Sequence, residues 1–178
     1  MSLSKAERTA KRIAYSYPQG YQYNPILVVN DVLLSNNIKV IPFDFNSKLS
    51  GMLVLYQNDY YISVNSNHSR RRRTFTISHE LGHYFLHSNT QTAFTCNEVL
   101  QCNNCGIERE ANDFAAELLM PTKTFYYYLK KGYSLSEISN CLRVSYEAVK
   151  WRFVNFCERN IKGFTPEKKR KLIKKLFS

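Results

Sequence analysis

Residues 79–83 read His-Glu-Leu-Gly-His, which puts two imidazoles four residues apart with a glutamate beside the first. On an α-helix, positions i and i+4 lie one above the other on the same face. Two imidazoles on that face can hold one zinc ion, each at about 2.0–2.1 Å. Glu80 is turned away from these ligands but stays close enough to act on a water at the metal. The motif therefore predicts that His79 and His83 bind Zn²⁺ and that Glu80 is the catalytic base.

A catalytic zinc ion takes a third protein ligand and keeps one position open for water. The helical pattern that begins near Ile107 offers three glutamates for this role, Glu108, Glu110 and Glu117. Glu108 and Glu110 border the apolar stripe of that segment on opposite sides. Helical geometry alone does not choose among the three.

The residues from Glu110 to Pro121 read Glu-Ala-Asn-Asp-Phe-Ala-Ala-Glu-Leu-Leu-Met-Pro. Together with the histidine motif, they resemble the ImmA/IrrE family of bacterial and phage metallopeptidases, over about residues 24–156. The resemblance implies a cytosolic zinc-dependent protease in which Glu110 is the third zinc ligand. It also implies a protein substrate, a helix-turn-helix repressor whose cleavage derepresses genes of a mobile element or a stress response. In length the chain resembles the short members of the family, which belong to mobile elements.

Two other functions fit the same residues. The chain could be a non-catalytic, zinc-containing regulator that binds a repressor, DNA or both. It could also be a structural domain that needs no metal. Zinc content does not separate the enzyme from the regulator, because both contain it. Cleavage of a repressor by the wild type and by Glu80→Gln does separate them.

The order of the predicted elements indicates an α+β fold of the zincin type, with a small antiparallel sheet before the histidine helix. Capping residues, such as Asn24 before Pro25, and apolar periodicity predict helices and strands along the whole chain. The predicted helices are 4–16, 26–34, a long helix after 70–73 that ends near His87, 107–120, 124–131, 136–142, 146–159 and 166–176. The predicted strands are 38–43, 51–56 and 60–65, of which the last two are expected to form a hairpin through residues 57–59, and residues 88–106 are expected to form a loop.

The net charge of +11 is unevenly distributed, since residues 1–120 carry +1 and residues 121–178 carry +10. Such an asymmetry indicates two tasks and an acidic partner for the basic end. We therefore expect a zinc metallopeptidase domain over residues 1–121. Residues 122–178 are expected to form a basic helical segment packed on that domain.

Residues 135–153 resemble a helix-turn-helix, with Ser145 as the N-cap of its second helix. Ser139 and Arg143 depart from that pattern, in which alanine and glycine are usual. The segment is either a helical pair packed on the peptidase or a reader of DNA. The candidate contacts for weak, salt-dependent nucleic-acid binding are Lys150, Arg152, Lys168, Lys169, Arg170 and Lys171.

Several weaker signals have an ordinary structural interpretation beside a functional one. Cys96, Cys102 and Cys105 are either plain thiols, a redox sensor, or part of a second metal site that needs a fourth ligand. His87 is either a surface or capping histidine or a neighbour of the metal ligand His83. The run at 70–73 is either a solvated cationic face or a contact for an acidic substrate segment.

Nothing in the sequence predicts a membrane span, because no apolar run approaches the roughly 20 residues that a span requires. The first twelve residues are polar and charged and contain no signal-peptide core. The five cysteines are an odd number, which fits a reducing compartment better than a disulfide framework. The expected location is the cytoplasm.

Overall fold

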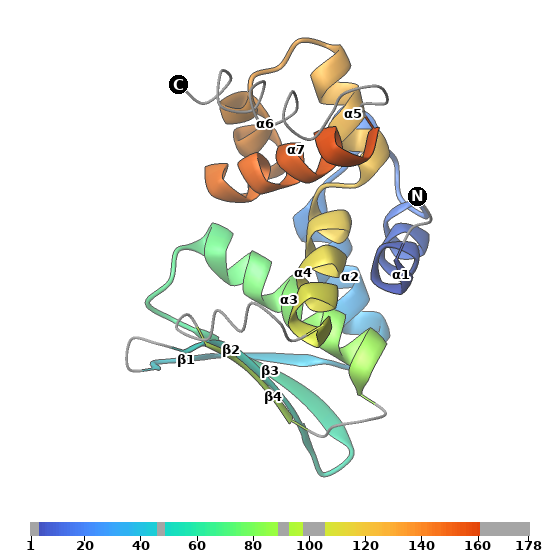
Figure 1. Ribbon diagram of the computed structural model, residues 1–178. Helices are drawn as coiled ribbons and strands as arrows, with labels where there is room; N and C mark the ends of the chain where they lie inside the picture. The colour runs from blue at the N-terminus through green and yellow to red at the C-terminus, as the bar shows by residue number, and fades with distance from the viewer. Residues whose placement is uncertain (1–3, 46–48, 89–92, 98–105, 161–178) are drawn as a thin grey trace.

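The computed structural model describes residues 4–45, 49–88, 93–97 and 106–160 (Figure 1). Its helices are α1 (Lys5–Ala14), the short 3-10 helix η1 (Gly20–Gln22), α2 (Pro25–Ser35), α3 (Arg70–His87), α4 (Gly106–Leu119), α5 (Thr122–Lys130), α6 (Leu135–Leu142) and α7 (Tyr146–Asn160). Its strands are β1 (Lys39–Phe43), β2 (Leu49–Tyr56), β3 (Asp59–Asn65) and β4 (Ala93–Asn97). The fold is α+β, as the sequence predicts.

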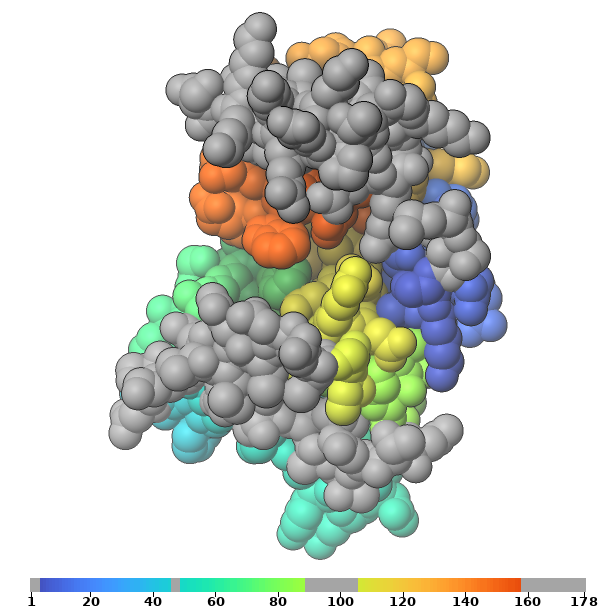
Figure 2. Space-filling model, viewed as in Figure 1, coloured from blue at the N-terminus to red at the C-terminus, as the bar shows by residue number. Residues whose placement is uncertain are grey.

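Figure 1 shows the sheet at one end of the molecule and α5, α6 and α7 at the other. Between them lie α3, which crosses one face of the sheet, and α4, which packs on α3. The helices α1 and α2 cover the sides of this central pair that the sheet leaves open. The space-filling view shows part of α4 at the surface of the molecule, just below α7 (Figure 2).

The sheet is mixed, which corrects the antiparallel sheet predicted from the sequence. Its strand order is β1-β3-β2-β4, and β1 runs parallel to β3 while the other two pairs are antiparallel. The predicted hairpin is present, with Gln57 and Asn58 at positive φ values of 48° and 68° in its two-residue turn. This hairpin leaves one edge of β3 open, and β1 pairs with that edge. Turn residues in a sequence predict only the pairing of consecutive strands, so they could not predict the pairing of β1 with β3.

A second correction concerns β4, which lies within residues 88–106 that we expected to form a loop. It pairs with β2 through a register that runs from Leu49–Asn97 to Val54–Ala93. The segment Ala93–Asn97 is only five residues long. Its extended form depends on the free edge of β2, which is a tertiary contact that its own residues do not encode.

Capping residues fix where several helices begin. Ser4 and Glu7 form a reciprocal capping box at the start of α1, and Asn24 with Pro25 begins α2 as expected. Ser69 accepts a hydrogen bond from the backbone N–H of Arg72 and so begins α3 at Arg70.

The contact between α3 and α4 is closest at Gly82. A Cβ atom at that position would lie 2.9 Å from the Cα of Ala111, a distance that side chains do not adopt. The hydrogen side chain of Gly82 therefore lets the two helix backbones approach. Phe114 and Leu118 of α4 are fully buried in the core beside this contact. The approach fixes the rotation of α4 about its axis, and with it the side chains that meet the histidines.

Candidate metal centre

The histidine motif lies in the last half of α3, between the sheet and α4. His79, Glu80 and His83 are all buried, with at most 2% of each residue exposed. The Nε2 atoms of His79 and His83 lie 3.0 Å apart, so both rings point to one position. This arrangement is the one that the spacing of the two histidines predicts.

Glu108 of α4 joins the two imidazoles. Its carboxylate oxygens lie 3.2 Å from Nε2 of His79 and 3.3 Å from Nε2 of His83. These contacts hold the pKa of Glu108 well below its usual range, so the group is a carboxylate. Burial lowers the pKa of His83, which favours the neutral imidazole that binds metals. Both effects give the cluster the protonation states of a ligand set.

The structure differs here from the expectation that Glu110 is the third ligand. The contact at Gly82 turns Ala111 toward α3, and Glu108 lies one turn before Ala111 on the same side. Glu110 is rotated away from that side, and its carboxylate lies 3.0 Å from Nε2 of His87. Glu117, the third candidate in the sequence, pairs with Arg152 instead.

The other ring nitrogens of the two histidines also have partners. Nδ1 of His79 lies 2.9 Å from Oδ1 of Asn112, which is one helical turn after Glu108 on α4. Nδ1 of His83 lies 3.2 Å from Nδ1 of His87. With each Nδ1 held in this way, Nε2 of each ring is directed to the shared position. Sequence reasoning missed Asn112, although its spacing of four residues from Glu108 is a signal that could have found it.

Glu80 has no ordinary structural partner. It is fully buried, and neither carboxylate oxygen has a hydrogen-bond partner of good geometry within the described residues, although the backbone of Leu53 on β2 lies close enough to favour the carboxylate. Burial raises the pKa of Glu80 to about 8. A buried carboxylate without donors is unfavourable unless a missing group satisfies it. A glutamate in this state, one residue from His79, fits a base that acts on a water at a metal.

The donor set fits a zinc ion. His79, His83 and Glu108 offer ligand atoms that all lie within 4.8 Å of one another. Two nitrogens and one oxygen, with room for a fourth group, are a typical set for catalytic zinc. Tetrahedral ligands at about 2.0–2.1 Å from the ion are about 3.3 Å apart, and the three spacings in this site are near that value.

A model of a peptidase family, described as the IrrE N-terminal-like domain, matches residues 35–154. The matched segment begins at the end of α2 and includes the sheet, the three candidate ligands and most of α7.

The chain belongs to the ImmA/IrrE family.

Two relatives extend this result. The chain is 37% identical over 103 residues to an uncharacterized immunity region protein of Bacillus phage phi105, covering 58% of this chain and 65% of the relative. It is 36% identical over 86 residues to the metallopeptidase ImmA of Bacillus subtilis strain 168, covering 46% of this chain and 48% of that protein. The matches thus span less than two thirds of either relative. The ImmA/IrrE family is one of metallopeptidases, which implies a metal ion, and the cluster of His79, His83 and Glu108 is a possible site for it.

The helix-turn-helix-like pair of this ImmA/IrrE chain consists of α6 and α7. Ser145 caps α7 through a hydrogen bond from the N–H of Ala148, as expected. Arg143 ends α6 in the left-handed conformation, at φ 54° and ψ 34°, where glycine is usual. Ser139 stands where alanine is usual, and its hydroxyl donates to the carbonyl of Val144, which closes the turn. Both departures from the pattern are therefore accommodated.

Arg152 is not a surface residue, which corrects its prediction as a nucleic-acid contact. Only 6% of it is exposed, and its guanidinium pairs with Glu117 of α4 and donates to the carbonyl of Met120. Lys150 is partly exposed and lies 3.6 Å from Glu147. The other four candidates, Lys168, Lys169, Arg170 and Lys171, lie outside the described residues. The buried arginine anchors α7 to the helix that carries Glu108.

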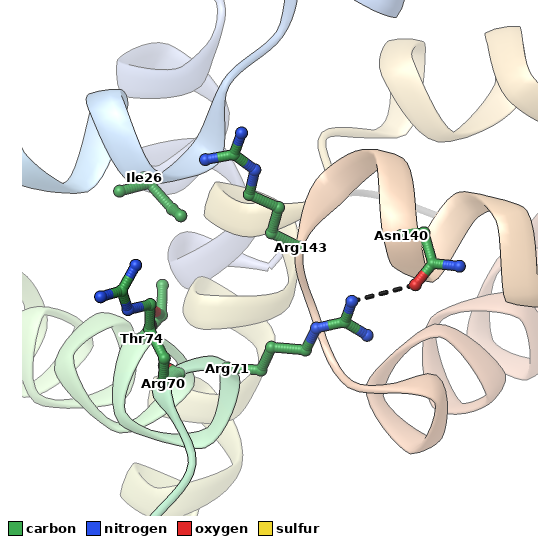
Figure 3. A pocket seen from close by; sticks show the side chains of 6 residues that line it. All are labelled: Ile26, Arg70, Arg71, Thr74, Asn140 and Arg143. Atoms are coloured by element: carbon green, nitrogen blue, oxygen red, sulfur yellow. Dashed lines mark hydrogen bonds between the residues drawn. The ribbon is translucent and has the colours of Figure 1, made fainter.

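A second arginine joins the same parts of the molecule. Arg71, at the start of α3, donates to Asn140, as Figure 3 shows, and also to Ser139 and the carbonyl of Val144. It lines a cavity of about 400 Å³ whose lining holds three arginines and no carboxylate: Ile26, Arg70, Arg71, Thr74, Asn140 and Arg143. The run at 70–73 is therefore partly structural, because Arg71 connects α3 to the turn between α6 and α7.

The remaining sequence signals are less informative in the structure. Cys102 and Cys105 lie outside the described residues, and Cys96 is placed only by the backbone of β4. Of the residues that the structure describes, no helix is both long and apolar enough to cross a membrane.

Proposed function

We propose that this chain is a zinc-dependent endopeptidase of the zincin type, with His79, His83 and Glu108 as metal ligands and Glu80 as the base. One observation carries the proposal. Two imidazole nitrogens and a carboxylate converge on one position, directly beside a fully buried glutamate that no side chain among the described residues satisfies. The ligand set of two histidines and a glutamate is that of the gluzincins.

A bound zinc ion supplies Lewis-acid polarisation of the scissile carbonyl and lowers the pKa of water toward 7. The residues of the chain do the rest. The carboxylate of Glu80 takes a proton from the attacking water and passes it to the nitrogen of the leaving amine. Burial of Glu80, which raises its pKa to about 8, prepares it to hold that proton during the reaction. Asn112 keeps the ring of His79 in the orientation that directs Nε2 to the metal position.

We further propose that the substrate is a helix-turn-helix repressor. A relative named for a phage immunity region and another named as the metallopeptidase ImmA support a setting of this kind. The domain division near residue 121 and a location in the cytoplasm remain parts of this proposal. So does weak DNA binding, which now depends on Lys150 and on the basic residues after 160, since Arg152 is buried.

The experiment is cleavage of the repressor encoded beside this gene, followed by gel electrophoresis and mass spectrometry of the fragments. The wild type with zinc should cut the repressor, and Glu80→Gln should bind zinc but lose at least a hundredfold in rate. The exposed Glu147 is the matched control, because Glu147→Gln makes the same chemical change on α7. If Glu80→Gln binds the repressor and derepresses as the wild type does, the chain is a non-catalytic regulator.

A further inference from the structure

We propose that His87 and Glu110 are positioning residues for the metal ligand His83, through a chain of hydrogen bonds that ends on a carboxylate. The inference rests on the metal site of the proposed function. It assigns a role to two residues for which that function has none so far.

The hydrogen-bond chain has two links. Nδ1 of His83 lies 3.2 Å from Nδ1 of His87, and Nε2 of His87 lies 3.0 Å from a carboxylate oxygen of Glu110. His83 and His87 are one turn apart on α3, whereas Glu110 comes from α4. These hydrogen bonds therefore join α3 and α4, the two helices that supply the ligands, at a point separate from the contact of Gly82 with Ala111.

The hydrogen bonds from His83 through His87 to Glu110 can all run from donor to acceptor in the same direction. A histidine that binds metal through Nε2 carries its proton on Nδ1, so His83 is the donor of the first link. His87 accepts on Nδ1, which leaves its own proton on Nε2 and directs that proton to Glu110. Each of the three groups then has the partner that its tautomer requires, with no donor facing another donor.

The geometry also excludes His87 as a ligand of the same ion. Its Nδ1 meets the ring nitrogen of His83 that points away from His79, so His87 lies on the outer side of the ligand. His87 is buried, while the side chain of Glu110 is 43% exposed at the outer end of the chain. The arrangement runs from the metal position to the surface.

The two metal histidines are thus held in different ways. His79 donates to the neutral amide of Asn112, whereas His83 donates to an imidazole that is itself paired with an anion. A carboxylate at the end of such a chain fixes the ring of the ligand and makes its metal-binding nitrogen more basic. Loss of partners of this kind weakens metal binding by roughly 10–100-fold.

The test is a zinc affinity measurement on the full chain, freed of metal and titrated against a chromophoric chelator. His87→Ala should weaken zinc binding by roughly 10–100-fold. Glu110→Gln keeps an acceptor but loses the charge, so its loss should be smaller. His87→Asn places an amide oxygen near the position of Nδ1 and should recover part of the affinity. Glu147→Gln, an exposed site on α7, should bind zinc as the wild type does.

Two further measurements separate positioning from folding. The visible spectrum of the cobalt(II)-loaded protein should change in His87→Ala, because the orientation of a ligand is altered. Unfolding of the metal-free proteins in urea shows whether a variant has simply lost stability, and affinities are compared only between variants that are folded.

The outcomes are distinct. If the wild type binds zinc tightly while His87→Ala and Glu110→Gln bind within twofold of it, with unchanged cobalt spectra, the inference is wrong and the metal site stands. If His87→Ala loses zinc as completely as His83→Ala does, His87 is a ligand and the positioning role is wrong. If the wild type itself binds no zinc, the proposed function fails and the inference fails with it.

Discussion

The guanidinium of Arg152 on α7 pairs with the carboxylate of Glu117 on α4, and both side chains are buried. Thr122 donates to the same carboxylate through its N–H and its hydroxyl, and Arg152 also donates to the carbonyl of Met120. The charged groups are thus surrounded by hydrogen bonds at the junction of α4, α5 and α7. Removal of one partner would leave the other charge buried without compensation.

This pair gives the first prediction. Arg152→Ala should lower the free energy of unfolding by about 3–5 kcal/mol, because it strands the carboxylate of Glu117 in the interior. Urea denaturation followed by circular dichroism measures the change. Lys150→Ala, which removes a partly exposed cation from the same helix, should cost less than about 1 kcal/mol. Equal costs for the two variants would contradict the assignment of Arg152 as a structural residue.

The contact between α3 and α4 gives the second prediction. Gly82→Ala adds a Cβ atom 2.9 Å from the Cα of Ala111, so the helices must separate. The strain should cost about 1–3 kcal/mol, of which the better helix propensity of alanine offsets up to about 1 kcal/mol. Zinc affinity should also fall, because Glu108 moves with α4.

Gly106 is the matched control for this substitution. Within the described residues, a Cβ atom at Gly106 meets no atom within 4 Å apart from its chain neighbours, so Gly106→Ala should leave both stability and zinc affinity nearly unchanged. Zinc titration and urea denaturation of the two variants provide the comparison. If Gly82→Ala bound zinc as tightly as Gly106→Ala, the close approach would not be what positions Glu108.

The left-handed turn at Arg143 gives the third prediction. An L-residue at φ 54° is strained, whereas glycine adopts this conformation without cost, so Arg143→Gly should stabilise the fold by about 0.5–1 kcal/mol. Arg143→Ala removes the same guanidinium but keeps the strained backbone. The glycine variant should therefore be the more stable of the two in thermal unfolding, and the reverse order would show that the turn is not strained.

The buried carboxylate of Glu80 gives the fourth prediction, for the metal-free protein. Burial raises its pKa to about 8 in the folded state, so the folded state binds a proton that the unfolded state has released above about pH 4.5. The contribution of this carboxyl group to the free energy of unfolding is largest below pH 4.5 and is lost as the pH rises through 8. The glutamine of Glu80→Gln does not titrate, so this variant should not show that loss of stability.

The measurement is urea unfolding of both proteins in the presence of a chelator, at pH 5 and at pH 8.5. The free energy of unfolding of the wild type minus that of Glu80→Gln gives the contribution of the carboxyl group at each pH. That difference should become less favourable to the wild type at the higher pH. No change between the two conditions would mean that Glu80 is solvated and its pKa is ordinary.

Local features of this chain could be predicted from its sequence. The spacing of His79 and His83 fixed one face of a helix, and that helix ends at His87 as expected. Asn24 with Pro25 and Ser145 mark helix starts because capping depends on neighbouring residues alone. The hairpin before α3 was equally predictable, since its turn residues and its two strands are contiguous.

Features that depend on packing could not be predicted in the same way. Which glutamate meets the two histidines depends on how α4 is rotated, and the approach of Ala111 to Gly82 sets the rotation that brings Glu108 to them. The parallel pairing of β1 with β3 and the strand β4 arise from free sheet edges. The burial of Arg152 requires Glu117, 35 residues away, so its charge alone suggested a surface role.

Anomalous X-ray diffraction at the zinc absorption edge tests the proposed metal position most directly. The anomalous difference map from crystals of the full chain grown with zinc should show one strong peak among the described residues. It should lie about 2 Å from Nε2 of His79, Nε2 of His83 and a carboxylate oxygen of Glu108. A peak coordinated by Glu110 or by His87, or no peak between the two histidines, would contradict the account.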